Sequence, residues 1–216
     1  MSANFIDPCS NICGITPITP VQSPLGLRGP RGIQGPPGIS GGGAIIPYAS
    51  GTPAVLTTVL GGLLGTTSLV GFGSSATGVS LVGGTIDLTG AGGTLLNMAF
   101  SVPRPGVITS ISAYFSNTLP VDLLLSTVTI TAQLYRALPA PLSNTFAPIP
   151  GAAVALAPPL TGLVALGTVS QGTTSGLAIP VAPGERLLMV FSAQETSGIP
   201  IAAAIVGYAS AGVAIN

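Results

Sequence analysis

The sequence predicts an all-β protein, a sandwich or barrel of short strands, that follows a short collagen-like repeat. Two observations carry this prediction. Residues 44–216 contain many short runs of apolar and β-branched residues, separated by glycine and proline, and such spacing is typical of sandwiches and barrels. In addition, glycine recurs at every third position between residues 26 and 41, as a collagen triple helix requires.

Residues 1–25 form an irregular leader that is rich in proline. Its apolar residues are spaced too widely to build a core, so we expect an extended connector that docks onto another subunit. Addition of this extended segment to a sheet edge or groove would use Phe5, Ile6, Ile12 and Ile15.

The leader also contains the two cysteines of the chain, Cys9 and Cys13. One interpretation is a crosslink between subunits, or a bond to an anchoring protein, once the surroundings become oxidising. The alternative is a disulfide within the leader, or two free thiols. A zinc site is not expected, because the chain has no histidine and no second pair of cysteines.

Residues 26–43 are predicted to form a collagen-like stalk that closes in a glycine hinge. Only glycine fits at the axis of a triple helix, and the glycines at the required spacing are Gly26, Gly29, Gly32, Gly35, Gly38 and Gly41. Three chains must then lie side by side, which predicts a homotrimer. Five triplets reach only about 45 Å, so we expect the domain that follows to hold the trimer together.

Several strands are predicted within residues 44–216. At residues 126–138, apolar residues alternate with polar ones, as in a half-buried strand. Residues 106–116 are a second strand, and residues 185–193 lack polar alternation and are expected to be covered on both faces. Residues 199–216 are predicted to hold two strands with a turn near residues 209–212. Further candidate strands are residues 85–88, 95–102, 152–157, 164–170 and 177–181, and the one candidate helix, residues 53–61, is rich in β-branched residues.

The composition argues against several classes of function. The chain has five basic and five acidic residues, no histidine and no net charge. Because phosphate binding needs clustered Lys or Arg, nucleic acid is not an expected partner. Glycine, proline, serine and threonine interrupt every apolar stretch, so no membrane span is predicted, and no signal peptide is recognised. A chain with so little charge is expected to associate with copies of itself.

No enzymatic activity is expected. Without histidine and lysine, the commonest general base and the Schiff-base nucleophile are both missing. The glycines of residues 71–78 match neither a P-loop nor a dinucleotide fingerprint. No cofactor is predicted. No metal is predicted either, because a calcium site would need six to eight oxygen ligands and residues 44–216 contain only four carboxylates: Asp87, Asp122, Glu185 and Glu195.

The few polar and aromatic side chains of the domain are expected to serve structure. Its carboxylates should pair with Arg104, Arg136 and Arg186 or lie exposed, and Glu185 is expected to be exposed at the start of a strand. Arg104 is a candidate for a contact between subunits. The tyrosines are expected to pack at the trimer interface; they are Tyr48, Tyr114, Tyr135 and Tyr208.

Several stretches of residues 44–216 together carry a resemblance to a known family: IIPYASGTPAVLTTVLGG, LVGFGSSATGVS, FSVPRPGVITSISAYFS, STVTITAQLYRA, FAPIPGAAVALAP, RLLMVFSAQ and VGYASAGVAIN. They resemble the C-terminal domain of the BclA/BclB-type collagen-like glycoproteins of the Bacillus exosporium, above all the BclB-related branch. This resemblance implies a jelly roll like that of complement C1q and tumour necrosis factor, assembled as a tight homotrimer on a collagen stalk at the spore surface.

The chain differs from that family in its stalk and its leader. The stalk has five triplets instead of dozens and lacks the Gly-Pro-Thr triplets that carry O-linked sugars, and FIDP matches the targeting leader only in part. A short stalk behind a cysteine-bearing apolar leader is similar to the subunits of endospore appendages. In such fibres a connector of one subunit enters its neighbour.

From these observations we expect a homotrimeric structural subunit of a spore-surface fibre, joined head to tail through residues 1–25. It would reside at the exosporium, outside the cell after lysis of the mother cell, and its main partner would be itself. Two alternatives stay open. One is a nap or tip fibril that the leader anchors to an exosporium protein, and the other is a C1q-like adhesin whose head binds a ligand.

Overall fold

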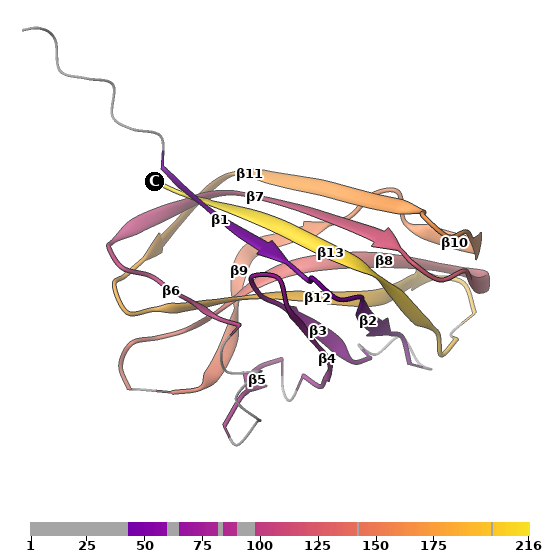
Figure 1. Ribbon diagram of the computed structural model, residues 1–216, viewed down its shortest axis with the longest axis horizontal. Helices are drawn as coiled ribbons and strands as arrows, with labels where there is room; N and C mark the ends of the chain where they lie inside the picture. Colours follow the sequence, from indigo (N-terminus) through magenta and orange to yellow (C-terminus); the bar gives the residue numbers. More distant parts are fainter. Residues whose placement is uncertain (1–42, 60–64, 82–83, 90–97, 142, 200) are drawn as a thin grey trace, which may run out of the picture. The chain divides into compact units, whose positions relative to one another are not determined.

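Every regular element of the described residues is a β-strand, which confirms the predicted all-β class. The computed structural model describes residues 43–59, 65–81, 84–89, 98–141, 143–199 and 201–216. The predicted connector residues, the two cysteines and the triple-helix glycines lie outside these residues. The strands (Figure 1) are β1 (Ala44–Ala49), β2 (Ala54–Thr57), β3 (Thr67–Val70), β4 (Ser75–Val79), β5 (Ile86–Asp87), β6 (Phe100–Ser101), β7 (Gly106–Asn117), β8 (Val121–Ala137), β9 (Thr145–Ala155), β10 (Leu160–Val164), β11 (Val169–Val181), β12 (Arg186–Ser197) and β13 (Ala204–Ile215).

The strands form two antiparallel sheets. The five-stranded sheet has the order β1-β13-β7-β11, and β2 also pairs with β13. The eight-stranded sheet has the order β4-β3-β12-β8-β9-β5, with β10 paired to β8 and β6 paired to β12. Backbone bridges join the two sheets on both sides, from Ala49 to Phe72 and from Ala157 to Gln171. The result is a nearly closed, barrel-like sandwich, consistent with a jelly roll.

The main hydrophobic core lies between the two sheets. Along β8 the predicted alternation is confirmed, because Val128, Ile130, Ala132 and Leu134 are all buried. Side chains at every second position of a strand point to the same face. The side chains between them, which are mostly threonine, turn away from the core.

β12 is buried on both faces, as its lack of polar alternation predicted. Leu187 and Met189 belong to the main core. Leu188 and Val190 belong to a second, smaller cluster on the other side of the eight-stranded sheet, together with Phe146 of β9. This strand therefore lies in the middle of the domain and carries a continuous apolar run because both of its faces are covered.

One prediction near the C-terminal end of the domain is wrong, and the one candidate helix, near the N-terminal end, contains a strand instead. Residues 204–215 form one strand, β13, without a turn at residues 209–212, because the alternation of buried positions runs unbroken from Ile205 to Ile215. The segment considered as a candidate helix, residues 53–61, instead contains strand β2, which pairs with β13. Pairing to an existing sheet outweighs the weak helical preference of this β-branched segment.

The candidate strand at residues 164–170 is not continuous. β10 ends at Val164 and β11 begins at Val169. Between them Gly167 has a φ of 80°, a left-handed conformation that glycine adopts readily, and its backbone N–H donates to the carbonyl oxygen of Asn117 at 2.8 Å.

The sandwich has two distinct ends, which we call the base and the apex. At the base, the backbone of Val107 forms two hydrogen bonds with Asn216, and Gly43 lies against the same residue. The apex is the opposite end, where β7 ends at Asn117 and β8 begins at Val121; Figure 1 shows β10 there and the C-terminus at the base. A strand of 12 residues such as β7 separates the two ends by about 40 Å.

Candidate functional site

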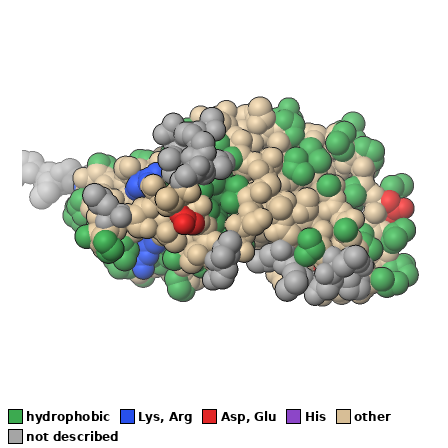
Figure 2. Space-filling model, turned by 90° about the horizontal axis from the view of Figure 1, so that it is seen from below, with side chains coloured by type: hydrophobic (Ala, Val, Ile, Leu, Met, Phe, Trp, Pro, Cys, Tyr) green, Lys and Arg blue, Asp and Glu red, His purple; other side chains and the backbone are tan. Residues whose placement is uncertain are grey.

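The five-stranded sheet carries no charged side chain. Its strands β1, β2, β7, β11 and β13 contain no Asp, Glu, Lys or Arg. The charged residues of the domain all lie on the eight-stranded sheet or in loops; they are Asp87, Arg104, Asp122, Arg136, Glu185, Arg186 and Glu195. Figure 2 shows arginine and carboxylate side chains on the side of the molecule that carries β4 and β5.

Strand pairing defines the outer surface of this sheet, which we call the uncharged face. Gly212 of β13 pairs with Pro47 of β1 and with Ser112 of β7. Two residues earlier, Ser210 pairs with Ala49 and with Tyr114. The middle of the face is therefore a floor of small side chains and contains a shallow groove of about 310 Å³.

Larger apolar side chains stand around this floor and are exposed. Tyr114 and Tyr208 are 39% and 49% exposed, and Ile45 is 73% exposed. Val107 and Val169 are also exposed. A sheet face with exposed aromatic and aliphatic side chains and no charge is a surface suited to association with another protein.

The other two tyrosines correct the prediction that all four pack at a trimer interface. Tyr48 is buried in the main core, and its ring stacks on Phe72 with the centroids 5.2 Å apart. Tyr135 is buried in the second cluster. Burial raises the pKa of both phenols above the ordinary value. Tyr114 and Tyr208 lie on the uncharged face, where packing between subunits stays a prediction.

Glu185 is not exposed, contrary to the prediction. Its side chain is buried just before β12, and its Oε2 atom lies 4.0 Å from a guanidinium nitrogen of Arg136. The predicted pairing with an arginine is therefore present. The sequence misled because Arg186 follows Glu185 directly, but neighbouring residues of an extended chain point to opposite sides.

The remaining carboxylates do not form a cluster. In Asp87, hydrogen bonds from Thr89 hold the pKa of the carboxyl below its ordinary value. Asp122 accepts a hydrogen bond from the backbone N–H of Leu124. Within the described residues, no three His, Cys, Asp or Glu side chains lie together in a way that could hold a metal ion. In the same residues, no helix is long and apolar enough to cross a membrane.

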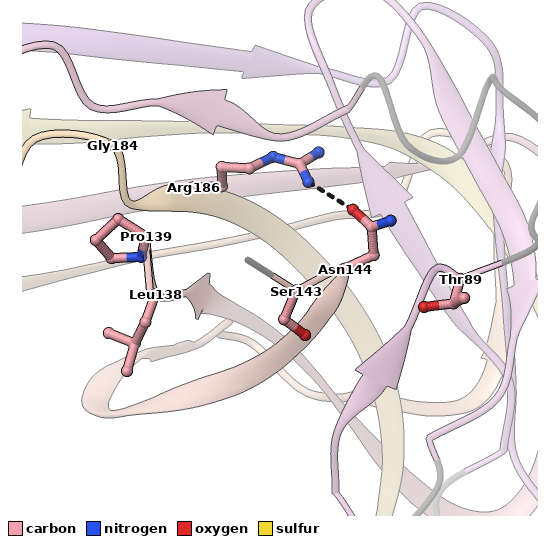
Figure 3. A pocket seen from close by; sticks show the side chains of 7 residues that line it. All are labelled: Thr89, Leu138, Pro139, Ser143, Asn144, Gly184 and Arg186. Atoms are coloured by element: carbon pink, nitrogen blue, oxygen red, sulfur yellow. Dashed lines mark hydrogen bonds between the residues drawn. The ribbon is translucent and has the colours of Figure 1, made fainter. Parts of the chain in front are cut away.

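A pocket of about 370 Å³ lies near the base, between the start of β12 and the loop before β9 (Figure 3). The guanidinium of Arg186 donates to the amide oxygen of Asn144 at 3.0 Å and lies 5.2 Å from the centre of the Phe146 ring. These contacts fasten the loop to β12. Arg104 is exposed at the base, as expected for a candidate contact between subunits.

Sequence reasoning did not find the uncharged face. The signal was present, because the charged residues of the domain leave long stretches empty, such as residues 137–184 and 196–216. These stretches contain strands of both sheets: β11 and β13 belong to the five-stranded sheet, and β9 and β10 belong to the eight-stranded sheet. Composition alone showed that charge is scarce, but only the topology shows that one face has none.

No protein-family model matches the chain. Over 178 residues, or 80% of its length, the chain is 38% identical to Collagen-like protein 1 of Acanthamoeba polyphaga mimivirus. This chain is similar to a collagen-like protein. It spans about one fifth of the length of that relative. Residues 1–43 make up only about one fifth of the chain, so a match over 80% of the chain must include most of the β domain. The similarity therefore does not rest on the glycine repeat alone. The exosporium family stays a prediction.

Proposed function

We propose that this chain is a structural, self-assembling protein whose β domain forms a homotrimer through the uncharged face. The observation that carries the proposal is the complete absence of charge from the five strands of that sheet. Burying this face between subunits would desolvate no ionised group, and such desolvation is the main cost of burying a charged surface. Ile45, Tyr114 and Tyr208 are exposed large side chains of this face, and they would gain by burial.

The position of β1 supports the same face on independent grounds. β1 belongs to the five-stranded sheet and begins next to Gly43, which is the first described residue and the last residue of the predicted stalk. A triple helix needs its three chains close to one axis. Three copies that meet through their five-stranded sheets would bring three β1 strands, and so three stalk ends, towards one axis.

The finer proposal is that these trimers are subunits of a bacterial spore-surface fibre at the exosporium. Residues 26–43 would act as a short threefold spacer, and residues 1–25 would bind the next trimer head to tail. Contacts of this heterologous type extend without closing, and three leaders at each junction add avidity. The similarity to a collagen-like protein supports a structural role. An enzymatic role is not part of the proposal.

The test compares the full chain with a variant that lacks residues 1–25. Light scattering should give the mass of three chains in each particle of the shortened variant, each chain being lighter than the 21.0 kDa of the full chain. Negative-stain microscopy should show fibres for the full chain alone. Monomers in both samples would contradict the trimer. Isolated trimers in both samples would contradict the fibre and favour a tip fibril anchored by the leader to an exosporium protein.

A further inference from the structure

The apex of the domain is covered by exposed aliphatic side chains. Each of them has more than half of its surface exposed, and they come from four separate connections or strand ends. They are Leu119 (55%), Leu124 (63%), Leu125 (78%), Leu163 (77%), Leu166 (69%) and Ile199 (62%). Figure 2 shows hydrophobic side chains gathered at this end of the molecule around a carboxylate.

Backbone contacts place these residues side by side. Leu163 of β10 pairs with Asp122 of β8. Gly198 packs against the backbone of Leu125, so that a Cβ on Gly198 would lie 2.4 Å from the carbonyl oxygen of Leu125. The side-chain amide of Asn117 donates to the carbonyl oxygen of Leu119 and to that of Ala165, the residue before Leu166.

At the apex, one exposed leucine has an energetically unfavourable backbone conformation. Leu124 has a φ of 53°, and it is the only residue other than glycine with a positive φ among the described residues. This conformation is unfavourable for a leucine. A hydrogen bond from the backbone N–H of Leu124 to Oδ1 of Asp122, at 2.9 Å, secures it. A strained residue that presents an apolar side chain to solvent is consistent with a binding surface.

The apex also offers a free strand edge. β10 pairs with β8 along one side, and no strand of the described residues pairs with its other side. Leu163, which is 77% exposed, belongs to this strand. Unpaired backbone groups along an edge can accept an extended peptide as an additional strand.

We propose that the apex binds the leader, residues 1–25, of a chain in the next trimer, and this inference rests on the proposed head-to-tail assembly. The leader has matching apolar chemistry: Asp7 is its only charged side chain, and Phe5, Ile6, Ile12 and Ile15 can cover exposed leucines. Extended, its 25 residues reach up to about 80 Å, which is ample to cross the apex and pair with β10.

The source of the leader follows from the two ends of the domain. The chain enters the domain at Gly43, at the base, and the apex lies at the other end of β7. In the chain, residues 26–43 lie between the leader and the base, and as a triple helix they would be about 45 Å long. In the proposed head-to-tail assembly, the leader bound at an apex belongs to another trimer.

The test uses the full chain and measures the fraction that sediments as fibres. Leu125→Asn and Leu163→Asn each remove an exposed apolar group, and both are expected to leave trimers intact while weakening the junction about tenfold for each leucine. Leu138→Asn is the matched control, because Leu138 is 53% exposed but follows β8 at the base. It should leave fibres unchanged. The double apex variant combines Leu125→Asn and Leu163→Asn. Fibres that form normally in this variant would overturn the inference.

A labelled synthetic peptide of residues 1–25 separates this inference from the proposed function. If the unmodified chain forms only trimers, the head-to-tail fibre fails, but saturable binding of the peptide that is lost in the double apex variant still supports the site. No binding to either protein overturns it. A peptide with Phe5→Ser and Ile6→Ser controls for non-specific adsorption. Pairs of trimers formed by the variant without residues 1–25 would instead identify a second apex as the occupant.

Discussion

The phenol oxygen of Tyr48 lies 3.5 Å from the backbone carbonyl oxygen of Leu187, and this contact joins β1 of one sheet to β12 of the other. The next residue, Ala49, donates its backbone N–H to Gly71, which follows β3 in the eight-stranded sheet. The first strand of the domain is therefore fastened to both sheets. Force transmitted through the proposed stalk would reach the whole sandwich through β1.

Replacement of Tyr48 by phenylalanine should destabilise the domain by about 0.5–1.5 kcal/mol, because it removes the hydrogen bond and keeps the buried ring. Tyr48→Ala also removes the buried ring beside Phe72 and should cost about 3–5 kcal/mol. Urea unfolding followed by circular dichroism measures both changes. Equal losses of unfolding free energy in the two variants would show that the buried ring of Tyr48 does not contribute to stability.

The same tyrosines predict how stability depends on pH. Burial raises the pKa of Tyr48 and Tyr135, whereas in the unfolded chain a tyrosine ionises near pH 10. Above about pH 10 the unfolded state releases these protons and the folded state retains them, so stability falls as the pH rises. The unfolding midpoint should fall above that pH, and less steeply in Tyr48→Phe. The chain contains no histidine, so a transition near pH 6.5 would contradict this account.

The sequence predicted the class of the fold because period-two alternation reports a buried face directly. This alternation predicted strand β8 correctly, and along β12 the missing alternation correctly indicated two covered faces. The prediction failed at β13, where glycine and alanine near residue 210 resembled a turn although they fill close-packed positions of a long strand. Local residues cannot show which strand will lie beside them, and that pairing decided the outcome.

The candidate surfaces were harder to predict for the same reason. The run VDLLLS at residues 121–126 resembles a buried strand, yet Leu124 and Leu125 are exposed at the apex. Only the positive φ of Leu124 and the meeting of distant loops turn these leucines outward. Patterns within one segment carry no information about surfaces that are assembled from four segments.

The buried carboxylate of Glu185 should make the domain sensitive to Arg136. Removing the arginine by Arg136→Ala leaves a buried charge without its partner, and because Arg136 is partly exposed we expect a loss of about 1–3 kcal/mol. Glu185→Gln removes the charge and should cost less. In the double variant the second change should recover part of the loss, as a thermodynamic cycle by urea unfolding would show. Strictly additive losses would mean that the two side chains do not interact.

Gly212 offers a way to test the trimer without disturbing the fold. A Cβ atom at this position would meet only Ile45, at 3.8 Å, and its backbone is not left-handed. Gly212→Asp should therefore fold, but it places a charge in the middle of the uncharged face. The desolvation of three such charges would cost several kcal/mol in a trimer. Light scattering should then give the mass of a single chain, 21.0 kDa.

The control for this variant places the same charge on the opposite side. Gln194 is exposed on β12, in the eight-stranded sheet, so Gln194→Asp should leave the trimer intact. Circular dichroism would show that both variants fold. A trimeric Gly212→Asp protein would mean that subunits meet through another surface.

The cysteines are predicted to link leaders to each other and never a leader to a head. Both cysteines of the chain, Cys9 and Cys13, lie in the leader, so the domain offers no sulfur partner. In the proposed trimer three leaders would emerge together from one stalk, and oxidation should link chains within a trimer. A denaturing gel without reductant should then show two- and three-chain species, which disappear when Cys9→Ser and Cys13→Ser are combined. Single-chain bands with no free thiols would indicate the intrachain disulfide instead, and a ladder beyond three chains would show that leaders of different trimers meet.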